Sequence, residues 1–228
     1  SLCSTVCKWT YLGHEDRWDP SYFKLVGLAD LLDNNAAKIG ATVKPMGEPL
    51  GRGLSQRAAS EMGLIPGTAV SVSIIDAHAG TIGILGASGV TGENANFDRR
   101  IALIGGTSTA HMAMSRSAHF IGGIWGPYYS AILPEYWLNE GGQSATGALI
   151  DHIIQTHPCY PELLAQAKSK GETIYEALNH ILRQLAGEPE NIAFLTKDIH
   201  ILPYFHGNRS PRANPNLTAI ITGLKQST

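Results

Sequence analysis

The sequence predicts an α/β protein, and three features of the chain support this fold class. An apolar run over residues 69–75 stops at a carboxylate followed by small residues, in the segment Asp76 to Gly80. A second apolar run, residues 101–104, opens into the glycine-rich turn Gly105-Gly106-Thr107-Ser108. Segments with helix caps and helical apolar spacing lie before and after these strand-like runs. Strands that alternate with helices are typical of α/β domains, whose ligands bind beside the carboxyl ends of strands.

Helix signals come first along the chain. Asp19-Pro20 supplies an N-cap and a first helical residue, and apolar residues at roughly helical spacing extend this helix to Asn34-Asn35. A shorter helix over residues 55–63 begins at a serine cap and ends at a glycine. After a turn at residues 64–67, the apolar run 69–75 predicts a buried strand.

The second half alternates strands and helices again. Residues 101–104 predict a strand, and residues 122–137 are aromatic and extended. A helix is expected to begin near Gly142. A capping box starts a further helix over residues 173–187, which a glycine ends, and residues 199–204 predict the last strand.

Between the two halves, residues 88–100 are polar and rich in turn formers, which predicts a domain junction. We therefore expect two domains, residues 1–90 and 91–228. The chain starts inside an apolar stretch and stops without a closing element, so we expect it to be part of a longer protein.

Composition excludes several function classes. With 43% hydrophobic and 16% charged residues, the 228-residue chain can fill a core and is not a disordered chain. A net charge of −2 provides no basic field for nucleic acid or an acidic membrane, and no apolar stretch approaches a membrane span. Three cysteines without a C-x-x-C spacing predict no metal site, and reduced thiols indicate the cytoplasm. Nine scattered histidines lack ligand spacing, so we interpret them as structural or surface residues.

Asp76 is the first candidate for chemistry. A carboxylate at a strand end, followed by small residues, can accept the proton of a substrate hydroxyl while that oxygen attacks a phosphorus atom. The simpler interpretation is an N-cap or turn residue.

The Gly105–Ser108 turn is the second candidate. Unhindered backbone N–H groups and two hydroxyls suit an anionic phosphate. The simpler interpretation is a tight hairpin. The turn is not a Walker A loop, because no G-x-x-x-x-G-K-[ST] pattern occurs in the chain.

The segment from Asn139 to Gly147 is the third candidate. A glycine pair at a helix start can hold an anion or nucleotide, and Glu140 can accept hydrogen bonds from a polyol. An ordinary glycine-rich helix start with a solvated glutamate is the alternative. Ser144 is no hydrolase nucleophile, because its spacing differs from G-x-S-x-G. Near the other end of the chain, Lys8 beside Trp9 has the pattern of a surface lysine lying over an apolar neighbour.

Taken together, these segments closely resemble the FGGY carbohydrate kinases, and in particular their ribulokinase-type members. The resemblance runs in order over nearly the whole chain. The matching segments are residues 7–11, 28–40, 75–80, 106–112, 125–128, 137–144 and 205–211.

The resemblance implies the ribonuclease H-like architecture of the actin, hexokinase and sugar kinase superfamily, with two α/β domains flanking a catalytic cleft, both incomplete here. Residues 1–90 would be the C-terminal part of the sugar-binding domain. Residues 91–228 would be the N-terminal part of the nucleotide-binding domain.

The same resemblance assigns roles by matching motifs. Asp76 corresponds to the catalytic base, which also contacts the substrate. The sugar site would be lined by Lys8 and Glu140, and the nucleotide would be contacted by Gly106, Thr107, Gly142 and Thr146. No residue of this chain is assigned to a metal, although Mg²⁺ and ATP are the implied cofactors.

The implied reaction transfers the γ-phosphoryl group of ATP to a terminal hydroxyl of a ketopentose, with D-ribulose as the expected acceptor. Xylulose, L-ribulose and ribitol stay open, as does a sugar- or nucleotide-binding relative that has lost catalysis. Expected partners are the sugar and ATP, with no nucleic acid and no membrane, and a homodimer is among the expected assemblies.

Three departures from the family pattern stand out. The N-terminal Asp-x-Gly-Thr phosphate turn and the later Gly-Gly adenosine motif are absent, which agrees with a fragment holding part of an active site. Ala219 stands where related sequences commonly have glycine.

Overall fold

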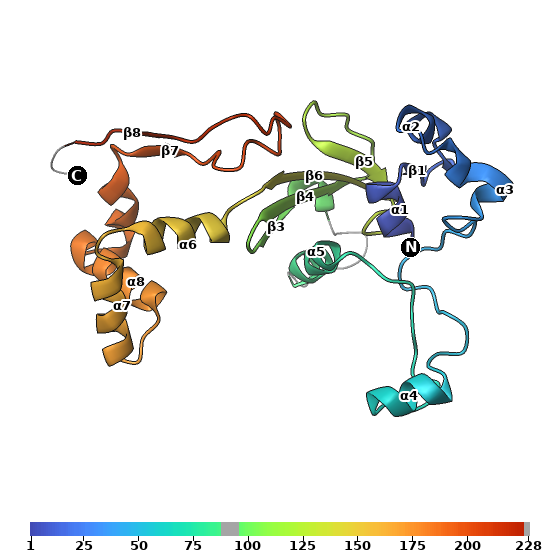
Figure 1. The fold of residues 1–228 in the computed structure, drawn as a ribbon, viewed down its shortest axis with the longest axis horizontal. Coiled ribbons are helices and arrows are strands. Elements are labelled where there is room, and N and C mark those ends of the chain that lie inside the picture. Colours follow the sequence, from blue (N-terminus) through green and yellow to red (C-terminus); the bar gives the residue numbers. More distant parts are fainter. Residues whose placement is uncertain (88–95, 226–228) are drawn as a thin grey trace. The chain divides into compact units, whose positions relative to one another are not determined.

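A computed structural model describes residues 1–87 and 96–225 of the chain (Figure 1). The chain divides into two compact units. Unit 1 comprises Ser1–Ile104 and Ala110–Gly142, and unit 2 comprises Gly105–Thr109 and Gln143–Thr228. The sequence-based domain boundary at residues 90–91 lies outside the described residues, so it stays a prediction.

A four-stranded sheet is the centre of unit 1. Its strand order is β3-β4-β6-β5, and the strands are β3 (Ile101–Gly105), β4 (Thr109–Ser115), β5 (Trp125–Tyr129) and β6 (Trp137–Gln143). β5 runs antiparallel to β6, with Trp125 opposite Glu140 and a register shift before Tyr128. The strand predicted over residues 101–104 is confirmed, and the aromatic segment 122–137 contains β5 and the start of β6.

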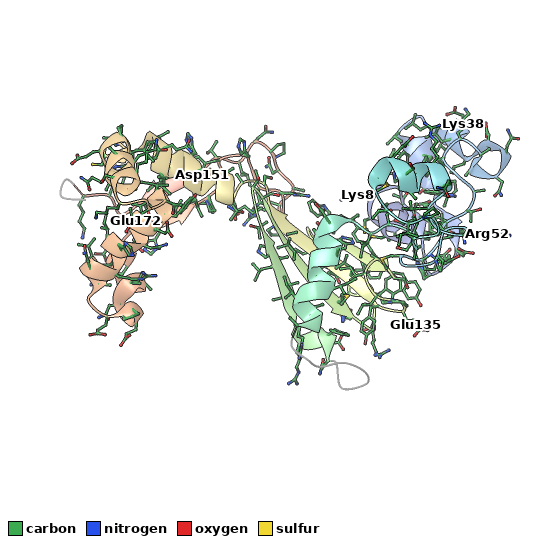
Figure 2. All side chains as sticks on the ribbon, turned by 90° about the horizontal axis from the view of Figure 1, so that it is seen from below. Lys8, Lys38, Arg52, Glu135, Asp151 and Glu172 are labelled. Carbon is green, nitrogen blue, oxygen red and sulfur yellow. The ribbon has the colours of Figure 1, made fainter. Side chains whose placement is uncertain are left out.

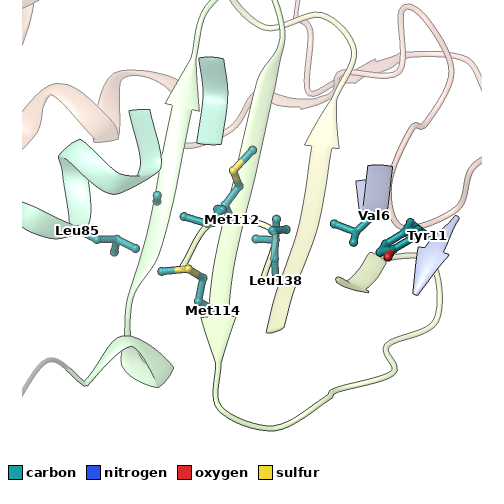
Figure 3. Close-up of a cluster of buried hydrophobic side chains, with 9 residues drawn as sticks. Val6, Tyr11, Leu85, Met112, Met114 and Leu138 are labelled. Atoms are coloured by element: carbon teal, nitrogen blue, oxygen red, sulfur yellow. The ribbon is translucent and has the colours of Figure 1, made fainter. Parts of the chain in front are cut away.

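The core of unit 1 lies between this sheet and two helices, α1 (Leu2–Lys8) and α5 (Asp76–Gly86). Figure 3 shows the buried cluster, in which α1 contributes Val6 and α5 contributes Leu85. The sheet contributes Met112, Met114 and Leu138, each at most 2% exposed. Because removing apolar surface from water is the main favourable term in folding, these contacts hold both helices against the sheet.

Short elements follow α1: the hairpin β1 (Tyr11–Leu12) and β2 (Arg17–Trp18), then α2 (Pro20–Leu25), the 3-10 helix η1 (Ala29–Leu32) and α3 (Asp33–Ala36). Asp19 caps α2 as predicted, because its side chain accepts a hydrogen bond from the Ser21 N–H. The single helix expected as far as Asn34-Asn35 is wrong. Gly27 has a φ of 75° and both asparagines also adopt positive φ, so the right-handed helix cannot continue.

The helix α4 (Gln56–Met62) confirms its predicted ends, with a Ser55 cap and Gly63 in the left-handed conformation. The buried strand predicted over residues 69–75 is wrong. Ser71 forms only an isolated antiparallel bridge with Pro49, and the segment then enters α5 directly. Backbone hydrogen bonds flank this bridge, from the Leu50 N–H to the Val70 carbonyl and from the Val72 N–H to the Glu48 carbonyl. Glycines with positive φ at 47, 51 and 53 bend the partner segment away from a regular strand.

Unit 2 contains three helices, α6 (Gly147–Thr156), α7 (Tyr160–Ser169) and α8 (Ile174–Ala186), followed by the 3-10 helix η4 (Pro189–Thr196). The capping box of Thr173 and Glu176 is present, and Gly187 ends α8 as predicted. β7 (His200–Leu202) pairs antiparallel with β8 (Ile220–Thr222).

Two predictions for this part of the chain are wrong. The helix expected near Gly142 begins at Gly147, because the glycine pair continues β6. The strand β7 is not the last one, since β8 pairs with it further along the chain. The predicted junction over residues 88–100 falls largely outside the described residues, which resume before the 3-10 helix η3 (Phe97–Arg99). No helix within the described ranges is long and apolar enough to cross a membrane.

Candidate functional site

The predicted site residues fall into two groups, one in each unit. Unit 1 holds the predicted base and the predicted sugar contacts, together with one predicted nucleotide contact: Lys8, Asp76, Glu140 and Gly142. Unit 2 holds the other predicted nucleotide contacts: Gly106, Thr107 and Thr146. Each group is described within its own unit.

Asp76 is the first residue of α5 and is exposed to solvent. Its Oδ1 accepts a hydrogen bond from the Ala77 N–H at 2.8 Å. A carboxylate in the first turn interacts favourably with the helix dipole, which explains why the chain can start a helix here. The sequence placed Asp76 at the end of a strand, whereas the structure places it at a helix start with its carboxylate open to a ligand.

Two residues further along the same helix lies a residue that the sequence interpretation missed. His78 is 1% exposed, and its Nδ1 lies 3.0 Å from Cys3 Sγ and 3.4 Å from the carbonyl oxygen of Ala131. Its Nε2 lies 3.8 Å from Glu140 Oε2 on β6, and Glu140 is itself 7% exposed. The available signal was the position of His78 two residues after the proposed base, in the segment Asp76 to Gly80.

The electrostatics of this cluster favour a charged histidine. Burial alone would lower the pKa of His78, but its contacts with Cys3 and Glu140 raise that pKa to about 9. Burial and the carboxylate of Glu140 raise the pKa of the Tyr128 phenol to about 12, together with the neighbouring Cys7. The Tyr128 phenol and the Cys7 thiol near Glu140 therefore stay protonated at neutral pH, while His78 holds a positive charge.

The two predicted sugar contacts, Lys8 and Glu140, both lie near one thiol. Lys8 is the last residue of α1 and is exposed (Figure 2). The pKa of the adjacent Cys7 is raised by burial, by Cys3 and by the Glu140 carboxylate, whereas the charge of Lys8 opposes this rise. Both charges thus act on Cys7, so the end of α1 and the middle of β6 approach each other within unit 1.

In unit 2, the turn at Gly106 is the hairpin between β3 and β4. The Gly106 N–H donates to the Ser108 carbonyl at 2.9 Å, and Gly106 and Thr107 are exposed. The hairpin also closes over the start of α6. The Thr146 N–H donates to the Thr107 carbonyl at 2.9 Å, and the Gly147 N–H donates to the Gly106 carbonyl at 3.0 Å.

This arrangement changes where an anion can bind. The N–H groups of Thr146, Gly147 and Ala148 at the start of α6 donate to hairpin carbonyls, so these three are not available to an anion. Gly142 is buried in β6, and the prediction that it lies at a helix start is wrong. Thr146 is tied to the hairpin by a second contact, because the Thr109 hydroxyl donates to the Thr146 hydroxyl at 2.8 Å. The exposed face of the hairpin, at Gly106 and Thr107, is what remains open to a phosphate.

The described residues do not form a set of metal ligands. Over residues 1–87 and 96–225, no group of three or more His, Cys, Asp or Glu side chains is arranged to hold a metal ion.

An open carboxylate can act as a base, and a glycine-threonine turn can contact phosphates, as phosphoryl-transfer enzymes require. Solved sugar kinases share the fold. A xylulose kinase from Rhodospirillum rubrum matches with a TM-score of 0.57 and 23% identity, over 90% of this chain and 35% of that chain. A xylulose kinase from Lactobacillus acidophilus matches with a TM-score of 0.59 and 17% identity, over 93% of this chain and 36% of that chain. The fold is therefore that of the actin- and hexokinase-like sugar kinases.

The family follows from the sequence match. The model of the C-terminal domain of the FGGY family of carbohydrate kinases matches residues 101–228, more than half of the chain. The chain therefore belongs to the FGGY family of carbohydrate kinases.

Relatives extend the match over the rest of the chain. An FGGY carbohydrate kinase domain-containing protein of Homo sapiens is 49% identical over 231 residues, covering 100% of this chain and 42% of the relative. A D-ribulokinase of Saccharomyces cerevisiae is 36% identical over 247 residues, covering 98% of this chain and 34% of the relative. The chain thus spans about two fifths of the first relative and about a third of the second.

Proposed function

We propose that the whole protein is an ATP-dependent ketopentose kinase whose acceptor is D-ribulose. The observation that supports it best is the pair of carboxylates in unit 1: Asp76 is open at the start of α5, while Glu140 is buried beside His78 of the same helix. The 36% identity with a D-ribulokinase over 98% of the chain supports the choice of acceptor.

In the proposed reaction, Asp76 accepts the proton of the terminal hydroxyl while that oxygen attacks the γ-phosphorus of ATP and ADP leaves. Glu140 and Lys8 hydrogen-bond the other hydroxyls of the sugar and orient it. Such positioning is a large part of phosphoryl-transfer catalysis, because the reacting oxygen must be in line with the leaving group.

The nucleotide belongs at the other group of residues. The exposed Gly106 and Thr107 of unit 2 would meet the phosphates. The resemblance implies Thr146 of unit 2 and Gly142 of unit 1 as further nucleotide contacts. When bound, Mg²⁺ would neutralise phosphate charge. The hairpin suits such a ligand because the space beside Gly106 is open. A Cβ built at Gly106 would have only the Ser108 carbonyl oxygen within 4 Å, at 3.8 Å.

The domain assignment is part of the same proposal: residues 1–90 contribute to sugar binding and residues 91–228 to nucleotide binding. The FGGY C-terminal domain match starting at residue 101 supports it. A cytoplasmic location, a homodimer and the absence of nucleic acid or membrane partners also remain proposals.

A substrate panel tests the function. The whole protein should release ADP with D-ribulose faster than with xylulose, L-ribulose or ribitol. Asp76→Asn should lower kcat by about a hundredfold or more, because proton transfer by a positioned base contributes about two to four powers of ten.

The matched control is Asp98→Asn, since Asp98 is likewise exposed in the first turn of a helix. Its kcat should equal that of the unaltered protein. A kcat for Asp76→Asn within threefold of the control would show that Asp76 is not the base. No turnover with any member of the panel would favour a binding protein over a kinase.

A further inference from the structure

His78 is a fully buried ionisable side chain for which the proposed reaction has no use. It lies two residues after Asp76 on α5 and is 1% exposed. Three segments contact its ring: α1 through Cys3, the connection between β5 and β6 through the Ala131 carbonyl, and β6 through Glu140. An ordinary core position would hold an apolar residue here, because burying a charged group costs free energy unless that group is paired.

Each ring nitrogen of His78 has a partner of its own. Nδ1 faces Cys3 Sγ at 3.0 Å and Nε2 faces Glu140 Oε2 at 3.8 Å. A protonated imidazole donates from both nitrogens, so it can satisfy the sulfur and the carboxylate together. The ring is thereby fixed between α1 and β6.

Glu140 needs such a partner. A buried carboxylate takes up a proton unless a cation or hydrogen-bond donors stabilise its charge. Titratable groups around this carboxylate include Cys3 and Cys7 from α1 and Tyr128 from β5, and each of them is neutral when protonated. His78 supplies the positive charge in direct reach of the carboxylate, and Lys8 lies beyond Cys7 at the end of α1.

We propose that His78 is a positioning residue that holds the Glu140 carboxylate ionised and fixed in orientation, so that it accepts hydrogen bonds from ligand hydroxyls. The choice of ligand rests on the proposed function. An ionised carboxylate only accepts hydrogen bonds, whereas a protonated one also donates, so the charge state decides which polyol arrangement fits. The side chain of Glu140 is 9% exposed, which leaves it a narrow opening toward a ligand.

The proposal predicts a specific dependence on pH. With His78 charged, the KM for D-ribulose should stay flat from pH 6 to 8 and rise as the pH passes about 9, where His78 loses its proton. In His78→Gln the cation is gone, so Glu140 should take up a proton as the pH falls. The sugar KM of this variant should then rise by about tenfold per pH unit once below its midpoint. kcat at saturating sugar should change little.

The control is His111→Gln, which replaces a half-buried histidine of unit 1 on β4, the strand next to β6. It should keep the flat KM profile of the unaltered protein. If His78→Gln raises the sugar KM by the same factor at every pH, His78 merely fills space and the proposal is overturned.

A second measurement does not depend on activity. In the whole protein labelled with ¹³C-histidine, the His78 resonance, assigned through the backbone of the labelled protein, should titrate near pH 9. In Glu140→Gln that midpoint should fall, because the contribution of the carboxylate is lost while burial and the Cys3 contact remain. A midpoint that Glu140→Gln leaves unchanged overturns the proposal. This titration also decides the matter if His78→Gln does not fold. Absent turnover of every sugar would count against the proposed function alone.

Discussion

At the scale of single residues, unit 1 places two carboxylates in opposite environments. Asp76 is exposed in a first helical turn, and Glu140 is buried beside a charged histidine. Groups of one chemical type acquire different roles when their surroundings differ in this way. The exposed carboxylate suits proton transfer at a ligand, and the buried one suits a fixed hydrogen-bond acceptor.

Thr107 offers a second residue-scale test, in unit 2. Its carbonyl holds the start of α6, whereas its exposed side chain is left for a ligand. Thr107→Val keeps the backbone contact and removes the hydroxyl. The KM for ATP should rise by about tenfold or more, since a hydrogen bond to a charged group is worth about 1.5–3 kcal/mol.

The sugar KM of Thr107→Val should change by less than twofold in steady-state kinetics. A rise in the sugar KM with an unchanged ATP KM would place the hairpin at the wrong ligand.

At the scale of elements, the hairpin and α6 are locked together by a close approach of two backbones. A Cβ built at Gly147 would lie 2.6 Å from the Gly106 carbonyl oxygen, closer than real Cβ contacts allow. Glycine at this position therefore lets the first turn of α6 dock on the hairpin. The proposed phosphate contact depends on that docking, because it sets the shape of the exposed turn.

Gly147→Ala should separate the two elements. Overpacking of this kind costs about 1–3 kcal/mol, so the variant should unfold at lower denaturant concentration and bind ATP more weakly. Gly83→Ala is the matched control, because Gly83 lies inside α5 and nothing is within 4 Å of a Cβ there. It should be stabilised by up to about 1 kcal/mol. Equal unfolding midpoints for the two variants would contradict the close approach.

At the scale of the whole molecule, the chain aligns over its full length with an FGGY relative, of which it covers about two fifths. Phosphoryl transfer requires both substrates to be held in line with charge neutralised around the phosphates. The first-strand phosphate turn and the adenosine motif are absent from residues 1–228.

Residues 1–228 expressed alone should therefore show negligible ATP turnover with D-ribulose. They should also associate, because large apolar side chains such as Leu25, Phe120 and Leu185 are 84%, 86% and 68% exposed. Turnover and sedimentation would be measured on this segment. A monomer with the turnover of the whole protein would contradict the expectation.

Several features could be predicted from the sequence because they depend on neighbouring residues. The Asp19, Ser55 and Thr173 caps, the Gly63 and Gly187 helix ends and the strand at 101–104 are all as predicted. A cap is a contact between residues two or three positions apart, so the local sequence determines it. The family, too, could be recognised from segments in order along the chain.

Only the tertiary structure decided the rest. The segment 69–75 looks like a strand by composition, but a strand needs a regular partner, and the positive φ angles of Gly47, Gly51 and Gly53 bend the segment opposite it. The local signal for His78 was its position two residues after Asp76, and this position does not reveal its partners, because its contact with Cys3 joins positions 75 apart in the chain. Its charge depends on burial and on Glu140 from a distant strand. Chain neighbours determine caps and turns, whereas the folding of distant segments onto one another determines burial and therefore the charge state of this site.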